Sequence, residues 1–234
     1  MSDNGHKDHA LLIQPIGYIE SDFGTKFGIP RQSNLVSEQR SVLVFTPEYR
    51  DENALRGLEG YSRIWLIWGF SEVYGRGWSP TVKPPKLGGN TRMGVFATRS
   101  PFRPNPLGLS SVALLEMKKE PGRGTVLVLG GADLMDGTPV YDIKPYLPYT
   151  DAHPEEKSGF AGSVSPERLP VEFPEALLAR IPAEKRPALL ASLSRDPRPG
   201  YLTAGEEPYG FAFAGMDVRF YVKDGTVHVF DVVP

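Results

Sequence analysis

Prolines and glycines recur along the whole chain, and this feature restricts the fold more than any other. The 234 residues include 23 prolines and 25 glycines, without any repeat. Proline interrupts helices and glycine permits tight turns, so long helices are disfavoured. The 12 phenylalanines and 10 tyrosines, together with many valines, are residues that favour strands. The sequence therefore predicts a mainly β protein built from short strands and tight turns.

Candidate strands follow one another in the first two thirds of the chain. We expect strands at residues 11–20, 41–45, 64–70, 94–98, 109–117 and 125–129. A short helix is expected at 51–58, where Asp51 suits the N-cap position. Strands that succeed one another without long helices favour an antiparallel sheet or barrel over a doubly wound fold. We therefore expect a single antiparallel β-barrel domain over residues 1–165.

The last third of the chain has a different pattern. Residues 149–169 are polar and mark the expected domain boundary. Apolar residues within 174–194 then predict two short helices, separated by Pro182 and Pro187. Asp224 and Gly225 lie between two apolar runs, which indicates a hairpin with a tight turn. We expect a small α+β domain over residues 166–234.

The composition and the missing motifs exclude several function classes. The chain has no cysteine, which excludes disulfides, thiolate metal sites and a cysteine nucleophile. Its histidines do not show zinc-ligand spacing, and the Rossmann, P-loop and nucleophile-elbow motifs are absent. No apolar run approaches the roughly 18 residues that span a bilayer. We expect a cytoplasmic protein with no metal and no membrane partner.

The charge distribution points to a nucleic-acid partner. The formal net charge is only −2, but no acidic residue lies between Glu72 and Glu116. A second stretch without acidic residues, 23–37, adds Lys26 and Arg31. A basic patch on a nearly neutral protein is typical of a phosphate-binding surface. The cations of the first stretch are Arg76, Lys83, Lys86, Arg92, Arg99 and Arg103.

Residues 91–109, TRMGVFATRSPFRPNPLGL, hold the densest group of recognition side chains. Prolines in this segment keep the backbone extended, so Arg99, Arg103 and Asn105 are expected to be held rigidly. Such side chains suit phosphate, carboxylate or base-edge recognition. Trp78, in the same basic stretch, is suited to stacking on a base. The alternative is a proline-rich surface loop whose arginines are merely solvated.

Residues 130–146 form a second group, in which carboxylates, an amine and a hydroxyl lie close in sequence. The aspartates do not have the spacing of an EF-hand loop, and no bidentate glutamate follows, so a calcium site is not predicted. For Asp136, ordinary turn chemistry is the alternative. The polar members of the group are Asp133, Asp136, Thr138, Asp142 and Lys144.

Outside this group, Trp65, Trp68 and Phe70 are interpreted as core residues.

These segments together resemble the tRNA methyltransferase family known as TrmO, also called YaeB-like or TsaA-like. GVFATRSPFRPN at 94–105 resembles the family signature, and DLMDGTP at 133–139 with DIKPY at 142–146 resembles its second motif. GLEGYSRIW at 57–65, KFGIPRQ at 26–32 and RDPRPGY at 195–201 are similar to further motifs. The chain departs from the family at one position, because Arg63 stands where the family usually has histidine.

The resemblance implies S-adenosylmethionine-dependent methylation of tRNA. The expected target is the N6 nitrogen of threonylcarbamoyladenosine at position 37, beside the anticodon. The resemblance also implies that the methyl donor binds on the single β-barrel, that the protein is a homodimer, and that the C-terminal domain helps to bind tRNA. A noncatalytic RNA-binding β-barrel is the leading alternative. A small-molecule hydrolase that uses the aspartates is a second one.

The motif residues fall into three expected groups. Those expected to bind the methyl donor are Lys26, Phe27, Arg99, Pro101, Leu107, Asp133, Asp136, Gly137 and Thr138. Those expected to bind tRNA are Arg31, Gln32, Trp78, Arg103, Asn105 and Arg198. Methylation of a nitrogen also releases a proton, which requires an acceptor. Asp142, Lys144 and Tyr146 are the candidates for that proton transfer.

Overall fold

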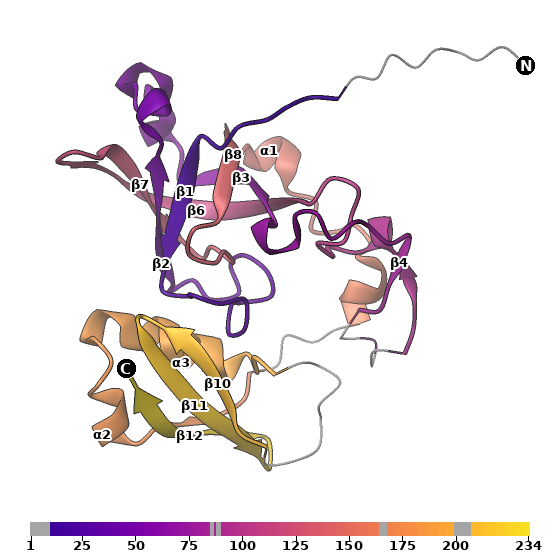
Figure 1. Cartoon of the computed structure of the whole chain (residues 1–234), viewed down its shortest axis with the longest axis vertical. Coiled ribbons are helices and arrows are strands. Elements are labelled where there is room, and N and C mark those ends of the chain that lie inside the picture. The colour runs from indigo at the N-terminus through magenta and orange to yellow at the C-terminus, as the bar shows by residue number, and fades with distance from the viewer. Residues whose placement is uncertain (1–9, 85–86, 88–89, 164–167, 199–206) are drawn as a thin grey trace, which may run out of the picture.

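The computed structural model describes residues 10–84, 87, 90–163, 168–198 and 207–234. These residues form two main sheets, each packed around its own hydrophobic core. In Figure 1 the N-terminal sheet lies above the C-terminal sheet, which is drawn in yellow.

The N-terminal sheet has six strands that pair antiparallel in a closed order. The order is β1-β2-β7-β6-β3-β8, and β8 pairs back to β1 through Gly17 and Val140. The prediction of a mainly β chain with an antiparallel sheet is confirmed. The sequence did not predict β8 as a strand. The bounds are β1 Gly17–Ser21, β2 Arg40–Phe45, β3 Arg63–Gly69, β6 Leu107–Glu120, β7 Gly124–Gly130 and β8 Pro139–Pro145.

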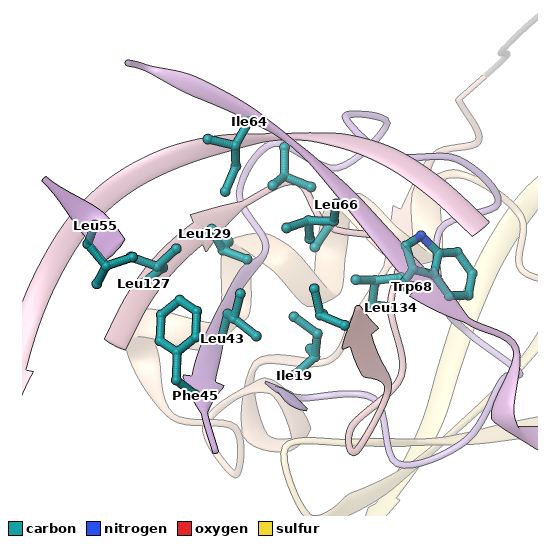
Figure 2. Packing of buried hydrophobic residues seen from close by; sticks show 13 residues of the cluster. Ile19, Leu43, Phe45, Leu55, Ile64, Leu66, Trp68, Leu127, Leu129 and Leu134 are labelled. Atoms are coloured by element: carbon teal, nitrogen blue, oxygen red, sulfur yellow. The ribbon is translucent and has the colours of Figure 1, made fainter. Parts of the chain in front are cut away.

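Alternation of side chains along these strands builds the first core. In β3, Ile64, Leu66 and Trp68 point into the closed sheet and are buried, whereas the residues between them are partly exposed. This is the period of two that a strand with one buried face requires. Figure 2 shows Leu43 and Phe45 of β2 pointing into the same interior as Leu127 and Leu129 of β7.

The connections contain short 3-10 turns, where two predictions were wrong. The expected helix at 51–58 consists of 3-10 turns at Glu52–Leu55 and Leu58–Gly60, although Asp51 does cap the first one. The expected strand at 94–98 is mostly a 3-10 turn, Val95–Ala97. Only Met93–Gly94 (β5) is a strand there, paired with Thr81–Val82 (β4). The remaining short elements are 3-10 turns at Pro47–Tyr49, Ser71–Val73 and Gly159–Ser163, and helix α1 at Pro148–Asp151.

The C-terminal sheet has four strands in the order β10-β11-β12-β9. The predicted hairpin is confirmed: Asp224 and Gly225 join β11 to β12, and both have positive φ. Two helical segments are present as predicted, but Pro187 lies in the first turn of α3 and does not interrupt it. The bounds are β9 Val171–Glu172, α2 Glu175–Leu178, a 3-10 turn Ala183–Lys185, α3 Arg186–Ser194, β10 Tyr209–Phe213, β11 Met216–Lys223 and β12 Thr226–Val233.

The loop after β1 enters the core of the C-terminal sheet. Phe23 is fully buried there, with its ring centroid 5.3 Å from that of Phe213. Asp22 accepts a hydrogen bond from Ala214 N–H and forms an ion pair of 2.8 Å with Lys185. Figure 1 shows this loop between the two sheets. The segment that precedes β2 is therefore fixed by both halves of the chain.

Candidate functional site

Two of the predicted motifs meet the start of a third at one end of the closed sheet. Arg99 donates a hydrogen bond through Nη1 to Oε1 of Gln32. The next residue, Ser33, donates its backbone N–H to the carboxylate of Asp133, and the Arg99 guanidinium lies close enough to act on that carboxylate. We call Gln32, Ser33, Arg99, Ser110 and Asp133 the Asp133 site.

The carboxylate of Asp133 ends a hydrogen-bonded chain that begins inside the core. Trp68 donates through Nε1 to Oγ of Ser110 at 3.1 Å, and that hydroxyl donates to Oδ1 of Asp133 at 2.7 Å. Burial raises the pKa of Asp133, while the hydrogen bonds from Ser110 and Ser33 and the charge of Arg99 oppose the rise. The site therefore holds a desolvated carboxylate beside an exposed guanidinium.

The turn after Asp133 uses its own polar groups to hold its shape. Asp136 accepts a hydrogen bond from Ser21 N–H at 3.0 Å, and its own N–H donates to Phe23 O at 2.9 Å. Thr138 is buried and donates to Met135 O at 2.7 Å. Gly137 has a φ of 75° and stays exposed at the tip of the turn. The turn chemistry that was the alternative for Asp136 is thus present.

The proline-rich loop that carries Arg99 is folded back on itself. Arg103 donates from Nη1 to Thr98 O at 2.9 Å and to Ser100 O at 3.3 Å. Asn105 is exposed, and its carbonyl accepts the N–H of Leu107 at 2.7 Å, where β6 begins. Pro101 is half-buried. The guanidinium of Arg103 therefore braces this loop from within.

Asp142, Lys144 and Tyr146 lie on the outer side of the closed sheet. Asp142 pairs with Ile67 across β3, and Lys144 pairs with Trp65, both outward-facing positions. Their side chains form an ion pair of 3.1 Å, and the ring of Tyr146 packs 5.5 Å from that of Trp65. The structure brings these candidates together on the outer face of the closed sheet, whereas the buried Ser110 faces its interior.

The remaining predicted residues are spread over the surface and the joint between the sheets. Phe27 stacks 6.2 Å from Tyr209 in the second core, and Lys26 is exposed beside it. Arg31 donates to Arg198 O, so it reaches the C-terminal half. Trp78 is 54% exposed.

Arg198 is held by its own neighbour. Its guanidinium donates twice to Asp196, at 2.8 and 2.9 Å, and only 11% of the side chain is exposed. The hydrogen bond that Arg198 donates to Asp196 is the main cause that raises the pKa of Arg198. Two of its guanidinium donors are therefore engaged within the chain.

Ser33 and Ser110 belong to the site, but the sequence reasoning did not select them. Trp68, which donates to Ser110, lies in the core as interpreted. Ser33 directly follows the KFGIPRQ motif, which was a usable signal. Ser110 lies inside a strand and gave no signal of its own. Within the described ranges no group of three acidic or histidine side chains is arranged to hold a metal ion. No helix in the same ranges is long and apolar enough to cross a membrane.

Comparison with known proteins gives matches over both halves of the chain. The family model of the tRNA-methyltransferase O N-terminal domain matches residues 18–152, and that of the TrmO C-terminal domain matches residues 166–234. A tRNA (adenine(37)-N6)-methyltransferase of Escherichia coli is 44% identical over 164 residues, which are 70% of this chain and 69% of that protein.

Two further relatives extend the comparison. A probable S-adenosyl-L-methionine-binding protein of Methanothermobacter thermautotrophicus is 37% identical over 62% of this chain and 96% of its own length. The crystal structure of TrmO from Pseudomonas aeruginosa superposes with a TM-score of 0.76 at 33% identity, and covers 96% of this chain and all of that one.

Proposed function

Because the chain belongs to the tRNA-methyltransferase O family, we propose that it is an S-adenosylmethionine-dependent tRNA methyltransferase. The proposed target is N6 of the adenosine at tRNA position 37, in the form that already carries a threonylcarbamoyl group. The observation that carries the proposal is the meeting of the family motifs at the Asp133 site.

The charges of the Asp133 site fit the polar end of the methyl donor. The amino-acid part of S-adenosylmethionine carries a carboxylate and an ammonium group. Arg99 is an exposed cation that complements the donor's carboxylate. The donor's ammonium group would stabilise the charged form of the desolvated Asp133. Leu107 is exposed and Pro101 is half-buried, and both would supply apolar surface for the donor. The turn from Asp136 to Thr138, with the exposed Gly137, would line the other side of the donor site. Lys26 and Phe27 would lie at its edge.

The bound donor supplies an electrophilic methyl group, and this chain must hold the adenosine nitrogen in line with it. As the new bond from nitrogen to carbon forms, the proton on that nitrogen leaves. We propose that the Asp142 carboxylate accepts this proton, with Lys144 holding Asp142 through their ion pair and Tyr146, which packs against Trp65, beside them on the outer side of the sheet.

The basic surface is the proposed tRNA-binding face. Trp78 is half-exposed in the stretch without acidic residues, where an indole ring can stack on an unpaired base. Gln32, Arg103 and Asn105 would contact the target nucleoside from the loop that carries Arg99. Arg31 and Arg198 would contact the RNA at the joint with the C-terminal half. We propose that residues 166–234 form a small domain that helps to bind tRNA.

We also propose that the closed sheet of residues 1–165 is a single β-barrel domain and that the protein is a cytoplasmic homodimer. Apolar side chains on the outside of β6 support a dimer, because Leu109 is 56% exposed and Leu107 is 36% exposed. Phe96, 75% exposed, lies in the loop before them. Light scattering at micromolar concentration tests this proposal, and a monomeric mass would contradict it.

The activity is tested by incubating tRNA with the purified protein, with and without the methyl donor, and analysing the nucleosides by mass spectrometry. We expect one added methyl group on threonylcarbamoyladenosine, only when the donor is present. Transcribed tRNA without the threonylcarbamoyl group tests the finer substrate assignment. Arg99→Ala should lose most of the activity, and a variant as fast as wild type would contradict the placement of the donor. Calorimetry with S-adenosylmethionine alone distinguishes the noncatalytic RNA-binding alternative, which predicts no binding.

A further inference from the structure

Arg63 makes a contact that the proposed chemistry does not use. It is the first residue of β3 and is partly buried. Its Nη1 donates to Oδ1 of Asn34 at 2.8 Å. Because Asn34 directly follows Gln32 and Ser33, this contact lies one residue from the Asp133 site.

Asn34 is held from three sides. Its N–H donates to Gly131 O at 2.8 Å, and its side-chain amide donates to Ser111 O at 2.9 Å. Its φ of 67° lies in the left-handed region, which asparagine tolerates better than most residues. A Cβ on Gly131 would lie 3.2 Å from Oδ1 of Asn34, so the two loops are in close contact. The side-chain oxygen of Asn34 thus accepts from Arg63, while Gly131 fixes its backbone and Ser111 fixes its side-chain amide.

This arrangement connects Arg63 to both charged groups of the site. Ser33, which precedes Asn34, donates its N–H to Asp133, and Gln32 accepts from Arg99. A rotation of Asn34 would therefore move both partners away from Asp133 and Arg99. We propose that Arg63 is a positioning residue, which acts through Asn34 to hold Gln32 and Ser33 against the site that binds the methyl donor.

The proposal rests on the proposed function for its ligand but not for its geometry. The side-chain hydrogen bond of Arg63 goes to Asn34 and not to the Asp133 carboxylate. A hydrogen bond from a charged donor at a partly exposed position changes an equilibrium by about tenfold. We therefore expect Arg63→Ala to raise the dissociation constant for S-adenosylmethionine about tenfold, measured by calorimetry without tRNA.

A double-mutant cycle tests whether Arg63 acts through Asn34. Asn34→Gly keeps the left-handed backbone accessible but removes the acceptor. If the proposal holds, the double variant binds the donor no more weakly than Asn34→Gly alone. Losses that multiply in the double variant would overturn it, as would wild-type affinity in Arg63→Ala. If the wild-type protein itself does not bind the donor, the proposed function fails first, and the exchange measurement below still tests the geometry.

Hydrogen exchange in the protein without ligand gives that second readout. The N–H groups of Ser33 and Asn34 are engaged by Asp133 and Gly131, so they should exchange slowly in wild type. Arg63→Ala should speed their exchange about tenfold and leave the melting temperature nearly unchanged. Unchanged exchange at both amides would refute the positioning role.

The matched control is a second arginine–asparagine pair on the same sheet domain. Arg56 donates through Nη2 to Asn53 in the 3-10 turn after Asp51, and both are exposed. Arg56→Ala should leave donor affinity unchanged. A direct contact of Arg63 with tRNA phosphate is a different explanation, in which Arg63→Ala would reduce the slope of tRNA affinity against salt by about one unit. A reduced slope with unchanged donor affinity would overturn the proposal.

Discussion

Phe23 tests whether the two halves of the chain are coupled. It lies in the loop after β1 but is fully buried in the C-terminal core, against Phe211 and Phe213. Phe23→Ala removes a whole buried ring, and such substitutions cost about 3–5 kcal/mol. Since domains of this kind are stable by only about 5–15 kcal/mol, this is a large fraction of the total. We expect a lower urea midpoint with an unchanged slope.

The assay can report on the two halves separately. Trp65 and Trp68 lie in β3, and Trp78 follows in the same half, so tryptophan fluorescence monitors the N-terminal sheet alone. Far-UV circular dichroism monitors both sheets. We expect Phe23→Ala to lower both midpoints, because the loop that carries residue 23 also holds the turn at Asp136. Phe230→Ala is the control, since that ring is 45% exposed and its loss should cost less than about 1 kcal/mol. A fluorescence midpoint equal to that of wild type would refute the coupling.

Two further substitutions test the Asp133 site and the packing of Gly108 against Trp68. Burial raises the pKa of Asp133, so its contribution to stability is present at pH values below its unfolded pKa and is lost as pH rises through its folded pKa. Asp133→Asn should therefore be at least as heat-stable as wild type at neutral pH while losing donor affinity, as shown by melting curves across pH and by calorimetry; a lower melting temperature at neutral pH would contradict this. A Cβ at Gly108 would lie 2.2 Å from the ring of Trp68. Gly108→Ala should thus cost about 1–3 kcal/mol in urea unfolding, whereas Gly94→Ala, with no atom within 4 Å of the added Cβ, should cost little.

The strands marked by a run of apolar and β-branched residues could be predicted from the sequence, and those without such a run could not. The apolar run of residues 64–70 predicted β3 to within one residue at each end. By contrast, residues 139–145 mix proline, tyrosine and charged side chains, because the outward positions of β8 carry Asp142 and Lys144. Residues 94–98 resembled a strand, but the N–H of Val95 bonds to Pro80 O and the chain turns there.

The site residues that belong to a motif could be predicted from the sequence. Those that reach the site through the pairing of strands could not. Arg99 and Asp133 stand in separate motifs, and the structure brings both to one place. Ser110 reaches Asp133 only because it pairs with Leu66 and so faces into the closed sheet. Serine is common on strands, so its sequence position alone does not distinguish this role. The burial of Phe23 among residues of the C-terminal half depends on contacts with residues distant in sequence, such as Phe213, 190 positions further along.

The segment from Asp22 to Asn34 connects the C-terminal core to the Asp133 site. Its first residues are fixed in the C-terminal core by Phe23 and by the ion pair of Asp22 with Lys185. Its last residues donate to Asp133 and Gly131 and accept from Arg63. Because the same short segment is anchored at both ends, a displacement in the C-terminal core changes the position of the groups beside Asp133. The C-terminal half therefore supports the Asp133 site through the backbone, in addition to any contact that it makes with RNA. Substitutions such as Phe23→Ala should then weaken donor binding even where tRNA is absent, which an RNA-binding role alone does not predict.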